Sequence, residues 1–209
     1  CRQCGSHISV QYPLVEAGTA ALWIGALWLL GPTVAAVRLA VVATILLGVA
    51  ITDAQSYLIP DGFTLNGLAF AAIGALVGLF IGEQLPFAGP WDALLGACTG
   101  AGAITIIGWL GEVAMKKEAM GYGDATLMAF VGATVGPVRA LVCVFLGAAL
   151  AAAAFLLVVF PIAWLRARRA GRDFEAPLVP FGVFLAPAAV LTLLFGNALL
   201  GWYVERAVG

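Results

Sequence analysis

The sequence predicts an all-α fold, a polytopic bundle of transmembrane helices, and two observations lead to that class. Hydrophobic residues make up 63% of the 209 positions, and charged residues only 10%. The mean hydropathy of the chain is +1.07. A water-soluble domain of this length cannot bury so much apolar surface, whereas helices that face lipid leave it exposed. The second observation is that the apolar residues fall into separate runs of helix length.

About seven spans are expected, because seven apolar runs are long enough, or nearly long enough, to cross a membrane. Short polar or Gly- and Pro-containing stretches separate the runs. The fifth run is short for a full crossing, so we expect it to be tilted, half-buried, or continuous with the sixth through Gly136-Pro137. The expected helices cover residues 15–31, 34–52, 63–82, 91–115, 125–136, 138–165 and 181–204.

Basic residues predict the orientation of these helices. Lys116 and Lys117 lie in one loop, and the stretch 166–172 carries four arginines. The stretch 83–91 carries an acid and no base. Loops rich in Lys and Arg stay in the cytoplasm. We therefore expect residues 1–13 to be cytoplasmic and, after seven crossings, the C-terminus to lie outside.

Two aspartates stand at the expected boundaries of these helices. Asp53 follows the second run, and Asp124 directly precedes the fifth. In the expected topology the second helix runs inward and the fifth runs outward, so both carboxylates lie near the cytoplasmic boundary at similar depth. Ionisable groups at a membrane segment are costly to keep there and indicate a functional site.

Paired aspartates favour hydrolysis. Two carboxyl groups held close share a proton, because like charges in a low dielectric do not both ionise easily. The ionised member takes a proton from water, and the protonated member donates to a peptide carbonyl. We therefore expect Asp53 and Asp124 to be catalytic residues of an aspartic protease that needs no cofactor for proteolysis. The single histidine, His7, lies outside the runs, which excludes a Ser-His-Asp triad or an HExxH site within the membrane.

Two glycines precede the second aspartate and are candidates for a supporting role. Gly121 and Gly123 flank Tyr122 just before Asp124. Residues without a side chain let a substrate backbone approach closely and permit positive φ. The alternative is that Asp124 only caps the next helix, since Asp is a preferred N-cap and glycine before a helix is ordinary.

Two further acids are weaker candidates. Asp61 is most simply a cap of the third helix, and the alternative is a supporting role near Asp53. Glu118 lies on the basic loop, where it either supports the catalytic turn and a basic substrate segment or is a surface charge paired with Lys116 or Lys117.

The N-terminal residues 1–13 form a segment of their own, and residues 14–209 form the expected transmembrane aspartyl protease domain. Cys1-Arg2-Gln3-Cys4-Gly5 has the CxxC spacing of half a tetracysteine zinc site. Cys1 and Cys4 are therefore candidate metal ligands, although half a site does not hold structural zinc tightly. His7 is an alternative ligand but is more simply solvated. Because no initiator Met is present, we expect the native protein to begin upstream or to be processed.

Four blocks follow one another along the chain and carry a family resemblance. They are Cys1-Arg2-Gln3-Cys4-Gly5 with Tyr12-Pro13-Leu14-Val15-Glu16, Asp53 with Ile59-Pro60-Asp61, Glu118-Ala119-Met120-Gly121-Tyr122-Gly123-Asp124, and Pro180-Phe181-Gly182 with Phe184-Leu185-Ala186. In this order they resemble the type IV prepilin peptidases, which are GxGD-type aspartyl proteases of pilus and type II secretion systems. The resemblance covers nearly the whole chain.

The resemblance implies catalytic roles for Asp53 and Asp124. It implies that a short basic leader, joined to an apolar helix, is cut from prepilins or pseudopilins after a glycine. The cut is implied to occur at the cytoplasmic face of the bacterial inner membrane. Many members of the family then methylate the new N-terminus with S-adenosylmethionine. The implied partners are the prepilin or pseudopilin and the lipid bilayer; no oligomeric state is implied. With a net charge of −1 and no basic patch, the chain is not expected to bind nucleic acid.

Departures from the family pattern concern the two accessory functions. The family normally has an upstream span and an earlier CxxC, so zinc binding and methylation are expected only with those segments. Thr126 stands where many members have a lysine, two residues after the GxGD aspartate. Neither proton-transfer step described above uses that lysine.

Two other functions remain as alternatives. A transporter or channel with carboxylates on its ion path also explains isolated acids near helix ends, but it does not explain the four blocks together. A presenilin-like protease would have its aspartates deeper in the bilayer and a PAL-type motif. Cleavage of a purified prepilin in detergent distinguishes these functions, because a transporter leaves the prepilin intact.

Overall fold

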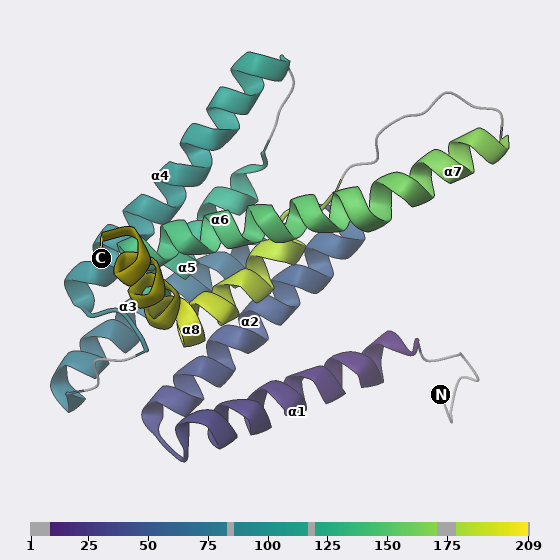
Figure 1. Cartoon of the computed structure of the whole chain (residues 1–209). Coiled ribbons are helices and arrows are strands. Elements are labelled where there is room, and N and C mark those ends of the chain that lie inside the picture. Colours follow the sequence, from purple (N-terminus) through teal and green to yellow (C-terminus); the bar gives the residue numbers. More distant parts are fainter. Residues whose placement is uncertain (1–8, 83–85, 117–119, 171–178, 209) are drawn as a thin grey trace, which may run out of the picture.

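The computed structural model describes residues 9–82, 86–116, 120–170 and 179–208, and every regular element within these ranges is helical. The predicted all-α class is therefore confirmed for this part of the chain, and Figure 1 shows the helices gathered into one bundle. In chain order the elements are α1 (Gln11–Leu30), α2 (Val34–Ser56), α3 (Asp61–Ile81), α4 (Pro90–Met115), α5 (Tyr122–Val135), α6 (Pro137–Ala154), the π-helix η1 (Phe155–Val159), α7 (Phe160–Ala170) and α8 (Gly182–Val208).

Six segments in the described residues are long and apolar enough to cross a membrane. Four of them are α1, α2, α3 and nearly all of α4. The fifth is the continuous helix through α6, η1 and α7, and the sixth is α8. Each one corresponds to an apolar run of the sequence, so the prediction of a polytopic membrane bundle is confirmed.

The helix α5 is the exception, because its 14 residues form a short helix enclosed by others. At about 1.5 Å per residue it is about 21 Å long, less than the ~30 Å of a hydrocarbon core. Its neighbours α3, α4, α6 and α8 all contact it, and every residue from Val131 to Val135 is buried. The prediction of a short buried helix is confirmed. The alternative of continuity with the sixth run is wrong, because Gly136, with φ of 88°, ends α5 before Pro137 begins α6.

Glycines bring α4 and α5 into backbone contact. A Cβ on Gly96 would collide with the carbonyl of Gly132, and one on Gly100 would collide with the carbonyl of Met128. Small residues allow membrane helices to approach in this way. The two helices are antiparallel, with the start of α4 beside Gly136 at the end of α5.

The helix α4 is longer than α5, so the start of α5 lies below the end of α4. The 26 residues of α4 give about 39 Å, against about 21 Å for α5. Since the two helices are aligned near Gly136, α4 extends well past the start of α5 at the opposite end (Figure 1). The residues that open α5 therefore lie below the rim of the bundle.

The rod formed by α6, η1 and α7 is longer than expected. It continues to Ala170, whereas the apolar run predicted an end near residue 165. Arginine is a good helix former, so Arg166, Arg168 and Arg169 extend the helix beyond its apolar part. Arg168 stacks on the ring of Trp164 at 5.2 Å from its centre. Figure 1 shows this end of the rod projecting from the bundle.

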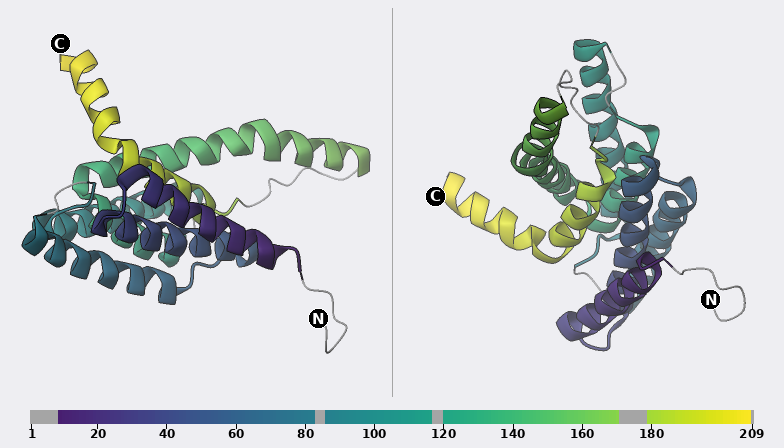
Figure 2. Two further views of the ribbon diagram at one scale, coloured as in Figure 1. Left: turned by 90° about the horizontal axis from the view of Figure 1, so that it is seen from below. Right: turned by 90° about the vertical axis from the view of Figure 1, so that its right-hand side faces the viewer.

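The helices α1 and α8 both pack on α2. Among the described elements α1 contacts α2 alone, whereas α8 contacts α2, α5 and α6. Figure 2 shows that α8 bends and that its C-terminal part turns away from the bundle. No contact between the backbones of α1 and α8 is found in the described residues.

Candidate active site

Asp53 lies in the last turn of α2, and its side chain is held from another helix. It is buried, with 5% of its surface exposed. The helix ends at Ser56, and Tyr57 takes a left-handed conformation (φ 54°) from which its N–H bonds to the Asp53 carbonyl at 2.9 Å. The carboxylate oxygen Oδ2 accepts a hydrogen bond from the backbone N–H of Val183, in the first turn of α8, at 3.2 Å.

Asp124 lies in the first turn of α5, outside the six segments long enough to span the membrane. Gly121 occupies the N-cap position and its backbone N–H donates to the Asp124 carboxylate. Burial, and then the negative charge of Asp53, raise the pKa of Asp124 to about 6, and the Gly121 bond opposes this. Asp124 is therefore not the N-cap of its helix. It belongs electrostatically to a pair with Asp53.

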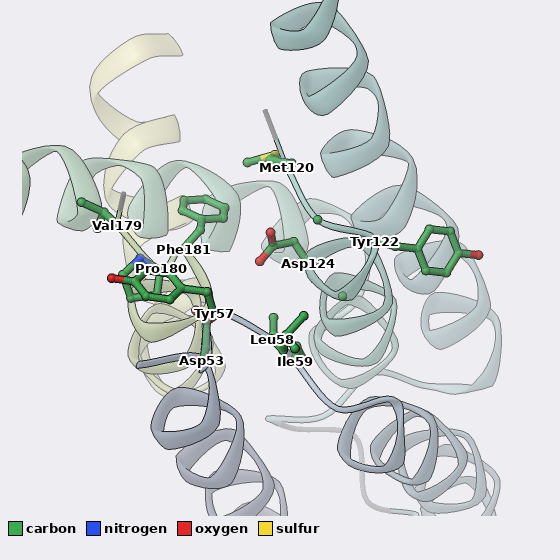
Figure 3. Close-up of a pocket in the computed structure, with 12 residues that line it drawn as sticks. Asp53, Tyr57, Leu58, Ile59, Met120, Tyr122, Asp124, Val179, Pro180 and Phe181 are labelled. Carbon is green, nitrogen blue, oxygen red and sulfur yellow. The ribbon is translucent and has the colours of Figure 1, made fainter. Parts of the chain in front are cut away.

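The two aspartates line one pocket of about 510 Å³. Figure 3 shows the Asp124 carboxyl facing the start of α8, with Asp53 at the end of α2 on the other side of the pocket. The ring of Tyr122 points away from both aspartates, and 85% of its surface is exposed. Three segments distant in sequence meet here: the end of α2 with the turn after it, the start of α5 and the start of α8. The lining residues are Asp53, Tyr57, Leu58, Ile59, Met120, Gly121, Tyr122, Gly123, Asp124, Val179, Pro180 and Phe181.

Two glycines allow these segments to come together. A Cβ on Gly182 would lie 2.9 Å from Asp53 Oδ2 and 3.0 Å from Ile59 Cδ1. A Cβ on Gly123 would lie 2.9 Å from the Cβ of Ile59. Both distances are shorter than real carbon contacts, so a side chain at either position would force the pocket wall to move.

The glycine of the predicted motif that faces open space is Gly121. The nearest atom to a Cβ there would be Asp124 Oδ2, at 3.9 Å. Neither Gly121 nor Gly123 has a positive φ; among the described glycines only Gly31, Gly82 and Gly136 do. The positive φ that glycine permits is therefore not used at either position. Glycine is needed at position 123 because a side chain there would collide with Ile59.

The structure separates Asp61 from the pair. Asp61 is the first residue of α3 and is exposed, and it does not line the pocket. The N-cap is Pro60, with no side-chain cap bond, so the interpretation of Asp61 as a cap is wrong. Its carboxylate still lies near the positive end of the α3 dipole, where a negative charge is favourable.

Three predicted residues, Cys1, Cys4 and Glu118, lie outside the described residues. Within the described residues no group of three His, Cys, Asp or Glu side chains is placed to hold a metal ion. Thr126, at the position of the family's lysine, donates its hydroxyl to the carbonyl of Gly123 at 3.0 Å. It therefore bonds the turn that carries Asp124.

The start of α8 belongs to the site, although no site role was assigned to it from the sequence. Pro180 and Phe181 line the pocket, Gly182 lies against Asp53, and Val183 bonds to it. The Pro180-Phe181-Gly182 block was the available signal. It contains no group that takes part in acid–base chemistry, so the residue types alone did not place it beside a carboxylate.

Fold and site together define a class: a polytopic membrane protein with two aspartates in one pocket at the ends of its helices. The family model for the type IV leader peptidase family matches residues 39–157, which is more than half of the chain. The chain therefore belongs to the type IV leader peptidase family. The matched region contains both Asp53 and Asp124.

Curated relatives extend the match to almost the whole chain. A prepilin leader peptidase/N-methyltransferase of Burkholderia pseudomallei (strain 1026b) is 38% identical over 197 residues, covering 94% of this chain and 59% of the relative. Proteins of the same name from Pseudomonas putida and Aeromonas hydrophila are 33% and 30% identical, covering 95% and 99% of this chain and 64% and 66% of their own lengths. The chain thus spans about three fifths of the length of the curated relatives it matches. No solved structure matches.

Proposed function

We propose that this chain is an aspartic endopeptidase that removes the short basic leader of type IV prepilins or pseudopilins, cutting after a glycine at the cytoplasmic membrane face. The observation that carries the proposal is the shared pocket of Asp53 and Asp124 at the recessed start of α5. The family and the names of the relatives support the substrate class.

The two carboxyl groups are assigned different protonation states in this mechanism. Asp53 accepts the N–H of Val183, a donor that an ionised carboxylate binds well. Burial and the charge of Asp53 raise the pKa of Asp124 to about 6, and we assign the shared proton to Asp124. A peptide that fills the pocket removes more water and raises the pKa of Asp124 further.

Hydrolysis then proceeds in two steps, each with two proton transfers. Asp53 takes a proton from a water molecule as the water oxygen bonds to the carbonyl carbon of the peptide, while Asp124 gives its proton to the carbonyl oxygen. The tetrahedral intermediate collapses when the carbon–nitrogen bond breaks. The proton now on Asp53 goes to the leaving amine, and the intermediate's hydroxyl proton returns to Asp124. No covalent bond to the enzyme forms.

The distribution of basic residues supports the cytoplasmic placement. Lys116 follows α4 at the end where α5 begins, and Arg166, Arg168 and Arg169 end the long rod. These are the positions that the positive-inside rule assigns to the cytoplasm. The pocket opens at the same end of the bundle as Lys116, so leader and enzyme would meet on that side.

The accessory functions are proposals for the full-length protein. Cys1 and Cys4 would supply two thiolates, half of a tetracysteine zinc site. Methylation of the new N-terminus would use S-adenosylmethionine, in line with the names of the relatives. Glu118 is proposed to attract the basic leader to the turn before Asp124, an effect that salt should weaken.

The test is cleavage of a purified prepilin by the chain in detergent, with Asp53→Asn and Asp124→Asn. Each substitution removes one member of the proton-transfer pair and should reduce cleavage by at least about a thousand-fold without changing expression. Asp61→Asn is the matched control, since it removes an exposed carboxylate outside the pocket, and it should keep near-normal cleavage. Near-normal turnover by either pocket variant, or an intact prepilin with the unmodified chain, would refute the proposal.

A further inference from the structure

An apolar groove lies between three helices of the bundle, and one of its lining residues, Val183, donates its N–H to Asp53. It forms because α1 and α8 both pack on α2 but have no backbone contact with each other in the described residues. Its volume is about 490 Å³, and its lining is entirely apolar. We call it the α1–α2–α8 groove.

The floor of the groove is a single face of α2. Ala43, Leu47 and Ala50 line it, and they are spaced as neighbours on one side of a helix. Asp53 lies three residues beyond Ala50 and so continues the same stripe. The floor therefore leads along α2 directly to the catalytic carboxylate.

One wall of the groove also ends at the pair. Val183, Pro187 and Val190 of α8 line this wall. Val183 lines the groove with its side chain and donates its N–H to Asp53. Pro187 has no N–H, so it does not make the helical bond to the Val183 carbonyl. The carbonyl of Val183, the residue whose N–H binds Asp53, therefore lacks its usual helical donor.

The length of the groove matches part of a membrane helix. From Ala43 to Asp53 the floor rises by about 15 Å, roughly half of the hydrocarbon thickness. A helix lying in it would place about three turns against α2 and α8, with its cytoplasmic end at the aspartates. Helices bind apolar grooves in this manner through side chains at i, i+3, i+4 and i+7.

The geometry points to the α1–α2–α8 groove as the binding site for the first three turns of the substrate's apolar helix, immediately after the cleaved bond. This rests on the proposed function, in which the leader is joined to an apolar helix. The groove fixes how far that helix protrudes, so it selects the peptide bond that reaches the pair. The alternative occupant of the groove is a lipid acyl chain, which would fill the same space without affecting cleavage.

The test introduces a large side chain into the groove, at a position distant from the aspartate pair. Leu191 lines it eight residues beyond Val183, about 12 Å along α8, and 41% of its surface is exposed. Leu191→Trp should raise KM at least about ten-fold for a synthetic substrate with a basic leader ending in glycine followed by a 20-residue apolar helix, with kcat unchanged. A peptide with the same leader and cut site but no apolar helix should be cut at the unmodified rate.

Leu141→Trp is the matched control, because Leu141 of α6 is also 41% exposed and does not line the groove. A second readout places the photo-reactive residue p-benzoylphenylalanine at 191 or 141. Position 191 should cross-link to the first three turns of the substrate helix, and position 141 should not. Cleavage by the unmodified chain with an unchanged KM in Leu191→Trp, or cross-links to lipid alone, would overturn the groove and leave the proposed function standing. No cleavage by the unmodified chain would overturn both.

Discussion

At the scale of single residues, the two aspartates are held by backbone donors from opposite sides of the pocket. Val183 of α8 donates to Asp53, and Gly121, just before α5, donates to Asp124. Because like charges in one pocket do not both form easily, one group carries the proton while the other stays ionised. This division makes the behaviour of each carboxyl depend on its partner.

The first prediction concerns the pKa of Asp124. It is raised to about 6 first by burial and second by the charge of Asp53. Asp53→Asn removes the charge and leaves the burial, so Asp124 should lose its proton at lower pH than in the unmodified chain, yet still above its ordinary value of 3.8. Infrared difference titration of the carboxylic-acid band, with Asp124→Asn as the reference, measures this. Asp61→Asn should leave the pKa of Asp124 unchanged; an unchanged value in Asp53→Asn would mean that the pair does not interact.

The second prediction separates the two glycines of the motif. Gly123→Ala should slow cleavage by roughly ten-fold or more, because its Cβ would press on Ile59 and displace the turn that carries Asp124. Gly121→Ala adds a methyl group at ordinary contact distance and should stay within about three-fold of the unmodified rate. Cleavage rates at saturating substrate provide the comparison. Equal losses in both variants would instead show that the approach of the substrate, and not packing against Ile59, requires glycine.

The sequence predicted the two pocket aspartates because a carboxylate at the end of an apolar run has few structural explanations. It did not distinguish Gly121 from Gly123, since the difference depends on Ile59, more than 60 residues away in the chain. It also misplaced the cap of α3, and the alternative of a cap at Asp124 is not found. Pro60 and Gly121 occupy the N-cap positions, and the aspartates follow them inside the helices.

At the scale of the elements, the position of Asp124 depends on how α4 holds α5. The contact is made by glycines whose missing side chains let the two backbones touch. The sequence showed that Gly and Ala are dense in this part of α4, but density alone does not tell which glycines face the partner. Gly96 and Gly100 do, whereas Gly102 has no atom within 4 Å of its would-be Cβ.

The third prediction uses this contrast. Gly100→Ala should destabilise the protein by roughly 1–3 kcal/mol, because its Cβ would collide with the Met128 carbonyl and force the helices apart. The thermal unfolding midpoint in detergent should fall, and cleavage should fall with it as Asp124 moves. Gly102→Ala is the control on the same helix and should match or exceed the unmodified midpoint, since Ala is the better helix former. Equal midpoints for the two variants would contradict the contact between α4 and α5.

At the scale of the whole molecule, composition and apolar runs predicted the bundle because lipid imposes helices on any segment that crosses it. The runs also predicted the short fifth helix. They did not predict the π-helical turn Phe155–Val159 or the bend of α8, because neither changes the hydropathy of the chain. The start of α5 lies below the end of α4 because of how the two helices align. The apolar runs carry no information about this alignment.

The fourth prediction concerns orientation. In a background with the native cysteines replaced by alanine, a cysteine at Ala167 should react with a membrane-impermeant maleimide only after spheroplasts are lysed. A cysteine at Gly89, an exposed position with open space around it, should react in intact spheroplasts. The basic rod end and the N-terminal end of α4 then lie on opposite sides. The reverse labelling pattern would put the pocket on the other face and contradict a cytoplasmic cut.

The enclosure of α5 also bears on how the protein is made. A 14-residue segment with an acid in its first turn is too short to remain in lipid alone. We therefore expect it to stay in the membrane only after the surrounding helices are in place. The surrounding helices include α8, which is synthesised last of the described helices and also donates the Val183 N–H to Asp53. Both aspartates leave the ribosome well before α8 does. We therefore expect the nascent chain to be inert until α8 has been inserted beside Asp53.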